Sequence, residues 1–395
     1  MRIATANGYD ATMDNLNNRQ AGLADLQEKL SAGKRVLRAS DDPTAMAQAE
    51  RAMNRIKRIE TEQRVLSSQK NSIALAESNL GDSIDSLQTI RELVLSAGNA
   101  AYTSSNRTSL AQQMTALRDL LFDRANAQDT NGIPLFGGLG SPDEAFTDGA
   151  SGVTFNGTPG QKSSSLTSIP AVLDGQSIWN SVPSGNGVFD VSLNSSNTGT
   201  VYSDNWNVIT PSSVTGDDYS ISFTVSGGVT SYTVTNTTQS STATTGTYTS
   251  GQAIVFDGIS IVPKGTPANG DSMTIVPSSN VSLFTVLDDA INSINNASNS
   301  NVLTHAIGKA IAEIDAGMSR LQSGRGQAGD LLNRADLIDS NMLSRTNQIQ
   351  NDRSRAEDID MVKGISDFQT QQIGYDAALK TYAQIQRLSL FNYMS

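Results

Sequence analysis

The two ends of the chain carry apolar residues in the same repeat, in which steps of four and three residues alternate. The N-terminal repeat runs through Tyr9, Met13, Leu16, Gln20, Leu23, Gln27 and Leu30. The C-terminal repeat runs through Met361, Ile365, Phe368, Gln372, Tyr375, Leu379 and Tyr382, and apolar residues continue to Phe391 and Tyr393. Such a repeat places one narrow apolar stripe on one side of a helix, as in coiled coils.

We therefore predict that residues 1–43 and 356–395 are helical arms that pair with each other as a coiled coil. Their predicted assembly surface consists of Met13, Leu16, Leu23, Leu30, Ile365, Phe368, Tyr375, Leu379, Tyr382 and Phe391. Two interpretations remain open: an ordinary helix hairpin within a monomer, or ends that become ordered only against neighbouring copies. Glutamines within the stripes favour the second, because a seam diluted with polar groups is weak on its own.

Helical periodicity also fills residues 44–138 and 281–355, which we predict to be the two halves of a helical rod domain. Gly33 predicts the end of the first helix, and Ser40, Asp41 or Asp42 before Pro43 predicts the beginning of the next. Between them lies a basic group that is typical either of a solvated turn or of a subunit-contact loop: Lys34, Arg35 and Arg38.

Residues 139–280 have a different character, because Ser, Thr, Gly and Asn dominate and short runs alternate between apolar and polar positions. Tyr219 to Val225 and Val229 to Val234 predict two strands joined by a hairpin turn at Gly227 and Gly228. The predicted fold class is therefore mainly α, with a small antiparallel β domain inserted into a long antiparallel helical rod. The insertion is either a solvated spacer or an adhesive, carbohydrate-binding face, and no spacing within it marks a site.

Composition narrows the possible functions. The chain has 395 residues and a formal net charge of -11, so nucleic acid is not an expected partner. It has no cysteine, which excludes disulfides, zinc–thiolate sites and thiol catalysis. No apolar run is long enough to span a membrane, and Met1 to Asp14 lack the apolar core of a cleaved secretory signal.

The sequence contains no constellation that calls for an enzyme, a metal or a cofactor. The single histidine, His305, excludes a Cys-His dyad and a zinc site with two His ligands. It lies in a helical pattern, and we expect it on a helix surface or between helices. The adjacent carboxylates Asp41 and Asp42 are expected to cap a helix rather than to act as a catalytic pair. We therefore expect no catalytic residues.

Several motifs, in this order, resemble a known family. Leu30 to Val36 followed by Ser40 to Pro43 resembles the N-terminal signature of the flagellin superfamily. Asn131 to Gly138 is similar to the turn that ends the N-terminal helical domain of that family, although Pro134 stands where an aromatic residue is common. Ser354 to Asp360 resembles the start of its C-terminal helix.

Two branches of this superfamily are candidates. The Asp-Asp-Pro sequence at residues 41–43 and the tail at 390–395 are similar to the hook-associated branch at the hook–filament junction. Residues 254–258 and 265–271 also resemble that branch. The alternative is a filament-forming flagellin, and a more distant one is a secreted adhesin that uses the β insertion.

The resemblance implies a structural subunit outside the cell, exported through the flagellar type III channel without a cleaved signal. It implies a homo-oligomeric ring as the assembled form. The implied partners are an adjacent hook-associated junction protein, the flagellin filament and an export chaperone that holds the C-terminal helix. Neither nucleic-acid binding nor membrane insertion is implied.

Overall fold

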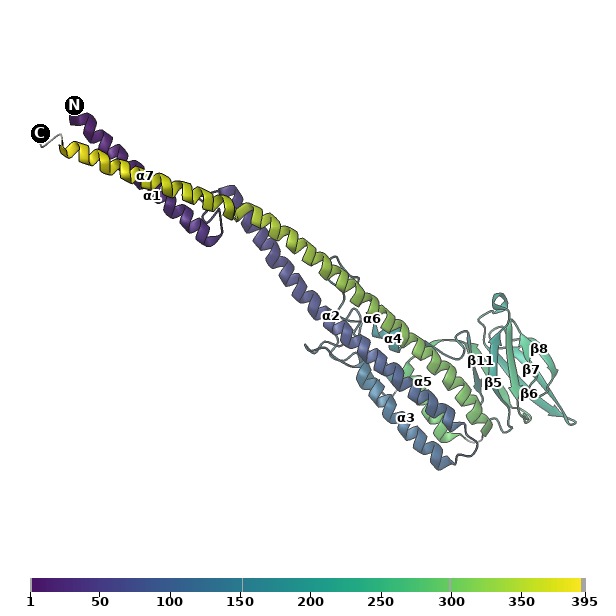
Figure 1. Cartoon of the computed structure of the whole chain (residues 1–395). Coiled ribbons are helices and arrows are strands. Elements are labelled where there is room, and N and C mark those ends of the chain that lie inside the picture. Colours follow the sequence, from purple (N-terminus) through teal and green to yellow (C-terminus); the bar gives the residue numbers. More distant parts are fainter. Residues whose placement is uncertain (1, 151, 298–299, 392–395) are drawn as a thin grey trace. The chain divides into compact units, whose positions relative to one another are not determined.

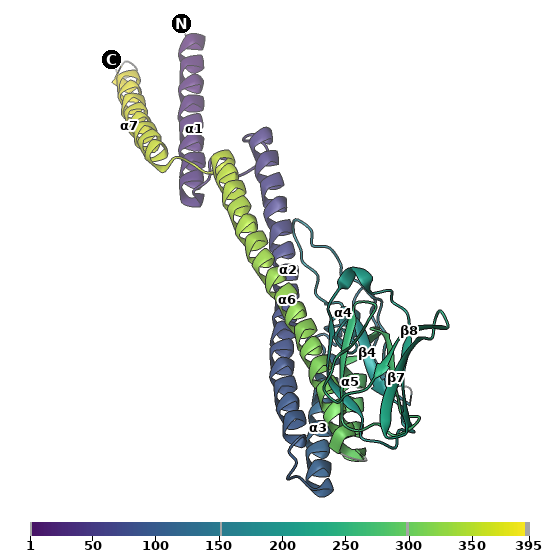
Figure 2. The ribbon, with the colours of Figure 1, turned by 90° about the vertical axis from the view of Figure 1, so that its right-hand side faces the viewer.

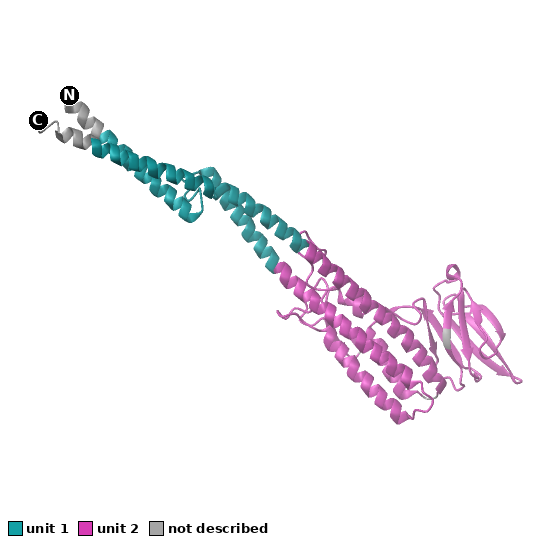
Figure 3. Cartoon of the chain, in the orientation of Figure 1, with its two compact units in different colours: residues 1–64, 338–395 teal, residues 65–337 magenta. Residues whose placement is uncertain are grey.

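The computed structural model describes residues 2–150, 152–297 and 300–391, without the side chains of residues 2–9, 204–205 and 385–391. The chain divides into two compact units (Figure 3). Residues 1–64 and 338–395 form the first, which we name the arm unit, and residues 65–337 form the second, the body unit.

Along the sequence, long helices precede and follow a β-rich part of the described residues (Figure 1). The helices are α1 (Arg2–Ala32), α2 (Pro43–Ala97), α3 (Ser104–Ala125), α4 (Gly175–Trp179), α5 (Leu283–Asn296), α6 (Ser300–Glu357) and α7 (Met361–Phe391). This is the predicted mainly α class with an inserted β domain, and the prediction is confirmed.

In the arm unit, α1 and α7 lie side by side, as both ribbon views show (Figures 1 and 2). They run antiparallel, because later residues of α1 contact earlier residues of α7. The contacts pair Gly22 with Gln371, Leu30 with Gly364, and Arg19 with Gly374. Gly22 of α1 and Gly364 and Gly374 of α7 let the helices approach closely, since a side chain at each would meet the partner helix.

The ends of the first two helices follow the predicted signals. α1 ends at Ala32, and Gly33 has a φ of 67°, the left-handed conformation that favours glycine at a helix C-terminus. Asp42 caps α2, because its Oδ1 accepts hydrogen bonds from the Ala45 N–H at 3.0 Å and from the Thr44 hydroxyl at 2.8 Å.

The last helix begins later than the expected arm boundary at residue 356. Ala356 and Glu357 end α6, and residues 358–360 interrupt the helix before α7 begins at Met361. Asp360 causes the new start, because its Oδ1 accepts from the Val362 and Lys363 N–H groups at 3.0 and 3.1 Å. By contrast, α6 continues without a break through Gly324 and Gly326.

The body unit has an aromatic core between its helices. Trp179 of α4 stacks on Phe284 of α5 with ring centroids 5.8 Å apart, and Phe136 meets Trp179 edge to face at 5.8 Å. The buried guanidinium of Arg118 in α3 ties this core together by pairing with Asp288 at 3.0 Å and Asp148 at 2.5 Å. Asp148 and Trp179, from the segment between α3 and the sandwich, therefore pack against α3 and α5.

The β strands all pair antiparallel, as predicted. They are β1 (Phe146–Gly149), β2 (Gly152–Phe155), β3 (Val182–Pro183), β4 (Phe189–Leu193), β5 (Tyr202–Val208), β6 (Tyr219–Ser226), β7 (Val229–Asn236), β8 (Ser241–Thr247), β9 (Ile254–Phe256), β10 (Ile259–Lys264), β11 (Ser272–Pro277) and β12 (Asn280–Val281). The β6–β7 hairpin turns at Gly227 and Gly228, whose φ angles are both positive, as the sequence predicts.

Two of the sheets form a β sandwich. One has the strand order β5-β10-β9 and the other β4-β11-β6-β7-β8. Their inner faces share one apolar core, in which the ring of Tyr219 lies 5.0 Å from that of Phe256. The sandwich core begins at Phe189, so it occupies only part of the expected range 139–280. Phe146 and Trp179, which precede it, pack against Phe284 of α5 instead. The five-domain division predicted from the sequence remains a prediction.

Helix α6 holds the sandwich through polar side chains spaced four residues apart, which we name the α6 ladder: Asn301, His305, Lys309 and Glu313. Asn301 donates to the Thr200 carbonyl, and the ring nitrogens of His305 lie 2.6 Å from the Ser203 carbonyl of β5 and 3.1 Å from the Val191 carbonyl of β4. His305 is thus buried against the edges of both sheets, which corrects the expected helix-surface or interhelix position.

The other two residues of the α6 ladder, Lys309 and Glu313, are charged. Lys309 contacts Asp190 of β4 at 2.5 Å, and Glu313 accepts a hydrogen bond from the Gly185 N–H at 2.8 Å. Burial, with repulsion from Asp190 and Asp289, raises the pKa of Glu313 to about 7. Burial also opposes the charge of Lys309, but its hydrogen bond to Asp190 raises the pKa of Lys309. For His305, burial lowers the pKa.

Candidate assembly surface on the terminal arms

The predicted stripe of α7 divides between two faces of the helix. Phe368, Tyr375 and Tyr382 are half-buried in the arm unit, and the contacts of Gly364 and Gln371 with α1 lie on the same side of the helix. Ile365 and Leu379 belong to the neighbouring face and are 47% and 40% exposed. About half of the residues in the α7 repeat therefore lie at the contact with α1.

A second apolar face on α7 is left open, and we name it the outer stripe: Met361, Val362, Ile365, Ile373 and Leu379. Its members are all at least 40% exposed, and Val362 reaches 82%. Scattered exposed apolar residues are common, but here they recur along one side of one helix. An apolar face of this kind is typical of a helix that packs against a further helix.

On α1 the predicted residues lie mostly at the helix pair. Leu16 is buried, Leu23 and Leu30 are half-buried, and Met13 is 45% exposed. The side chain of Phe391 lies outside the described residues. The role of the ten predicted residues in assembly remains a prediction.

A joint connects the arms to α2 and α6 within the arm unit. The Arg35 N–H donates to the Glu357 carbonyl at 2.7 Å, and the Ile359 N–H donates to the Gly33 carbonyl at 3.1 Å. The Glu357 carboxylate is buried between Lys34 at 3.3 Å and Arg353 at 2.7 Å. The connection between α1 and α2 is thus joined to the connection between α6 and α7 by backbone hydrogen bonds and by an ion pair.

The basic group before α2 is used inside the chain. Arg35 donates to the Ala356 carbonyl at 2.9 Å and lies 3.3 Å from Asp42, and Arg38 pairs with Glu28 at 2.9 Å. Hydrogen bonds from the Ala45 N–H and the Thr44 hydroxyl lower the pKa of Asp42 to about 2. The sequence identifies these residues and the cap, but not the roles of Glu357, which pairs with the distant Lys34 as well as with Arg353, and Asp360, which caps α7 through backbone N–H groups.

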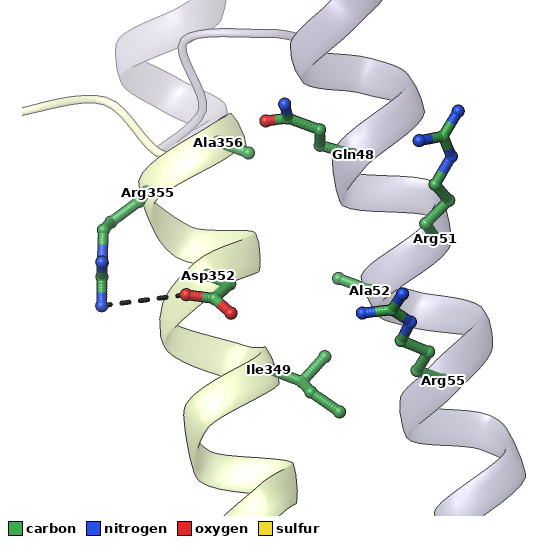
Figure 4. Close-up of a pocket in the computed structure, with 8 residues that line it drawn as sticks. All are labelled: Gln48, Arg51, Ala52, Arg55, Ile349, Asp352, Arg355 and Ala356. Atoms are coloured by element: carbon green, nitrogen blue, oxygen red, sulfur yellow. Dashed lines mark ion pairs between the residues drawn. The ribbon is translucent and has the colours of Figure 1, made fainter.

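An open groove lies between α2 and α6 in the arm unit, beside the joint (Figure 4). Its volume is about 450 Å³. We name it the arginine groove; Ala52, Ile349 and Ala356 form its apolar floor, and Arg51, Arg55 and Arg355 are its basic residues. Sequence reasoning did not single it out, because arginines on a long helix are usually solvated.

The described residues show neither a group of acidic, His or Cys side chains suited to a metal ion nor a helix long and apolar enough to cross a membrane.

Comparison with known proteins identifies both helical parts. Residues 3–141 match the bacterial flagellin N-terminal helical region, and residues 311–394 match the bacterial flagellin C-terminal helical region. Residues 192–277, in the sandwich, match the D2-like domain of flagellar hook-associated protein 1. The chain therefore belongs to the flagellin superfamily.

Within this superfamily the chain is of the FlgL type. It is 34% identical to flagellar hook-associated protein 3 of Salmonella typhimurium over 157 residues, which are 38% of this chain and 48% of that protein. The chain thus spans about half the length of the curated relatives it matches. A flagellin of Bacillus subtilis is 29% identical over 136 residues, 34% of this chain and 45% of that protein.

Solved structures extend the likeness over most of the chain. The flagellar junction protein FlgL of Legionella pneumophila is 28% identical with a TM-score of 0.68, and the match covers 73% of this chain and 99% of that one. FlgL of Xanthomonas campestris is 26% identical with a TM-score of 0.69, covering 78% and 99%.

Proposed function

We propose that this chain is a structural subunit of the bacterial flagellum that forms the junction between hook and filament by self-assembly of its terminal helices. The outer stripe of α7 carries the proposal, because an apolar face that α1 leaves uncovered is suited to a neighbouring copy. The likeness to FlgL structures supports the place in the flagellum.

The proposal includes the partners of such a subunit. They are further copies in a ring, an adjacent hook-associated junction protein, the flagellin filament, and an export chaperone on the C-terminal helix. The subunit acts outside the cell after export, and it works by packing, with no catalysis and no cofactor. Each neighbour adds apolar burial to the arms, so assembly stabilises them by mass action.

Deletion of the gene tests the proposal. The expected result is cells that retain hooks but lack filaments and release flagellin monomer into the medium, with immunogold labelling of the tagged protein confined to the hook–filament junction. Labelling along the whole filament, together with loss of the major filament protein in the deletion strain, would instead establish the second candidate, a flagellin. The match to the Bacillus subtilis flagellin is the observation that favours this second candidate.

A further inference from the structure

The arginine groove has the shape and charge of a docking surface. Its floor contains two alanines, and these small side chains leave space between α2 and α6 that larger residues would fill. Arg51 and Arg55 stand one helical turn apart on α2, as Figure 4 shows. A helix laid along α2 could therefore place an apolar side chain on the floor and an acidic group beside each arginine.

The charges of the groove are not balanced within the chain. Arg355 lies 3.8 Å from Asp352, but among the described residues no carboxylate forms an ion pair with Arg51 or Arg55. Other arginines near the joint do have such partners, as Arg353 has in Glu357. The groove therefore presents an excess of positive charge to its surroundings, although the chain as a whole is acidic.

The first helix carries the complementary pattern. Asp10 and Asp14 are exposed on α1, one turn apart, and Met13, which is 45% exposed, lies on the same face between them. No ion pair links either aspartate to another described residue. The steps of three and one residues at Asp10, Met13 and Asp14 match the steps of one and three at Arg51, Ala52 and Arg55 when the two helices run antiparallel.

We propose that the arginine groove binds the Asp10–Met13–Asp14 face of α1 from a second copy of this chain. The contact rests on the proposed function, in which copies assemble, and it names one surface of that assembly. Each guanidinium pairs with one carboxylate, and the Met13 side chain covers the alanine floor. Because the pairs remain near water, they select the partner and its register, and the contact weakens as salt rises.

Engineered thiols test the contact directly, because the native chain has no cysteine. Full-length Met13→Cys and Gln48→Cys variants are mixed, allowed to assemble and oxidised; Gln48 lines the groove and is exposed. We expect a disulfide-linked dimer. Ala11→Cys, which is exposed on the opposite side of α1, is the matched control and should give little cross-link with Gln48→Cys.

Charge reversal provides the second arm of the test. We expect Arg51→Glu with Arg55→Glu to lower the cross-link yield about tenfold, and Asp10→Lys with Asp14→Lys to do the same. A chain that carries all four substitutions should recover most of the yield, because the pairs are restored with their signs exchanged. Circular dichroism of each variant checks that the helices are intact, and Arg51→Gln with Arg55→Gln serves where reversal disturbs them.

The outcomes separate this contact from the proposed function. Assembly that proceeds without the Met13–Gln48 cross-link, and is unaffected by the charge changes, overturns the contact and leaves the proposed function standing. Charge reversal that impairs assembly without rescue by the fourfold variant overturns α1 as the occupant. If the unaltered chain forms no multimers with itself or at flagellar junctions, the proposed function and the contact fail together.

Discussion

The buried carboxylate of Glu313 makes the stability of the body unit depend on pH, and Glu313→Gln isolates this effect. The pKa of Glu313 rises from 4.5 to about 7 on folding because burial and the neighbouring carboxylates of Asp190 and Asp289 disfavour its charge. The folded chain thus holds a proton between pH 4.5 and 7 that the unfolded chain has released. The stability that the protonated Glu313 carboxyl contributes is therefore fully present below pH 4.5, and this contribution is lost as pH rises through 7.

The magnitude follows from the shift. One pKa unit corresponds to about 1.4 kcal/mol, so Glu313 alone lowers the free energy of unfolding by roughly 3 kcal/mol between pH 4.5 and 8. Glutamine keeps the oxygen that accepts from the Gly185 N–H but cannot ionise. The difference in free energy of unfolding between the native chain and Glu313→Gln should therefore change by roughly 3 kcal/mol over this range, in favour of the variant at high pH.

Urea unfolding at pH 5, 6, 7 and 8 measures this difference. Fluorescence of Trp206 reports unfolding around the α6 ladder, because its ring lies 5.5 Å from that of His305. The Trp179→Phe background removes the signal of the other tryptophan. Asp330→Asn, an exposed carboxylate of the same helix outside the ladder, is the matched control. The titration of His305 is common to the native chain and the variant. If the difference in free energy of unfolding between the native chain and Glu313→Gln stays constant from pH 5 to 8, burial and neighbouring carboxylates do not raise the pKa of Glu313.

Further predictions concern the ladder, the sandwich and the arms. His305→Gln should remove a contribution that lowers the stability as pH falls below 6.5 and that is opposite in sign to the contribution of Glu313, since burial holds the folded pKa of His305 below that of the unfolded chain; the difference between the native chain and the variant in the same urea series checks it. Phe223→Ala should cost the sandwich about 3–5 kcal/mol and leave the aromatic core of the helices native by near-UV circular dichroism. Asp360→Ala should weaken the start of α7 by about 1 kcal/mol, seen as faster amide exchange at residues 361–364, whereas equal exchange would argue against the cap. In the isolated subunit, protease should cut before residue 40 and after residue 356 faster than in the body unit, and arms that resist cleavage would favour a stable hairpin.

The sequence predicts those features of the fold that local chemistry determines. Periodicity identifies the long helices, Gly33 and Asp42 mark helix ends, and the glycine pair at residues 227–228 marks a hairpin turn. Each signal acts within a few residues of its position, so it can be read without knowing the rest of the chain.

Features that depend on distant partners are not predictable in this way. His305, Lys309 and Glu313 look like ordinary polar positions of a helix until β4, β5 and Gly185 lie against them. The same is true of the α7 stripe. Its repeat predicts one continuous seam, but α7 contacts α1 through the face that contains Gly364, so Ile365 and Leu379 of the stripe remain exposed.

Assembly through the outer stripe is tested most directly by one pair of substitutions on α7. Leu379 is 40% exposed, whereas Thr381, two residues on, is exposed on the other side of the helix. A carboxylate at position 379 would be buried without a partner at a subunit contact, which is costly, while one at 381 would remain in water. The measurement is electron microscopy of flagella, with assay of flagellin in the medium, in cells producing Leu379→Asp or Thr381→Asp.

We expect hooks without filaments and released flagellin for Leu379→Asp, and normal flagella for Thr381→Asp. Normal junctions in cells that produce Leu379→Asp would contradict it.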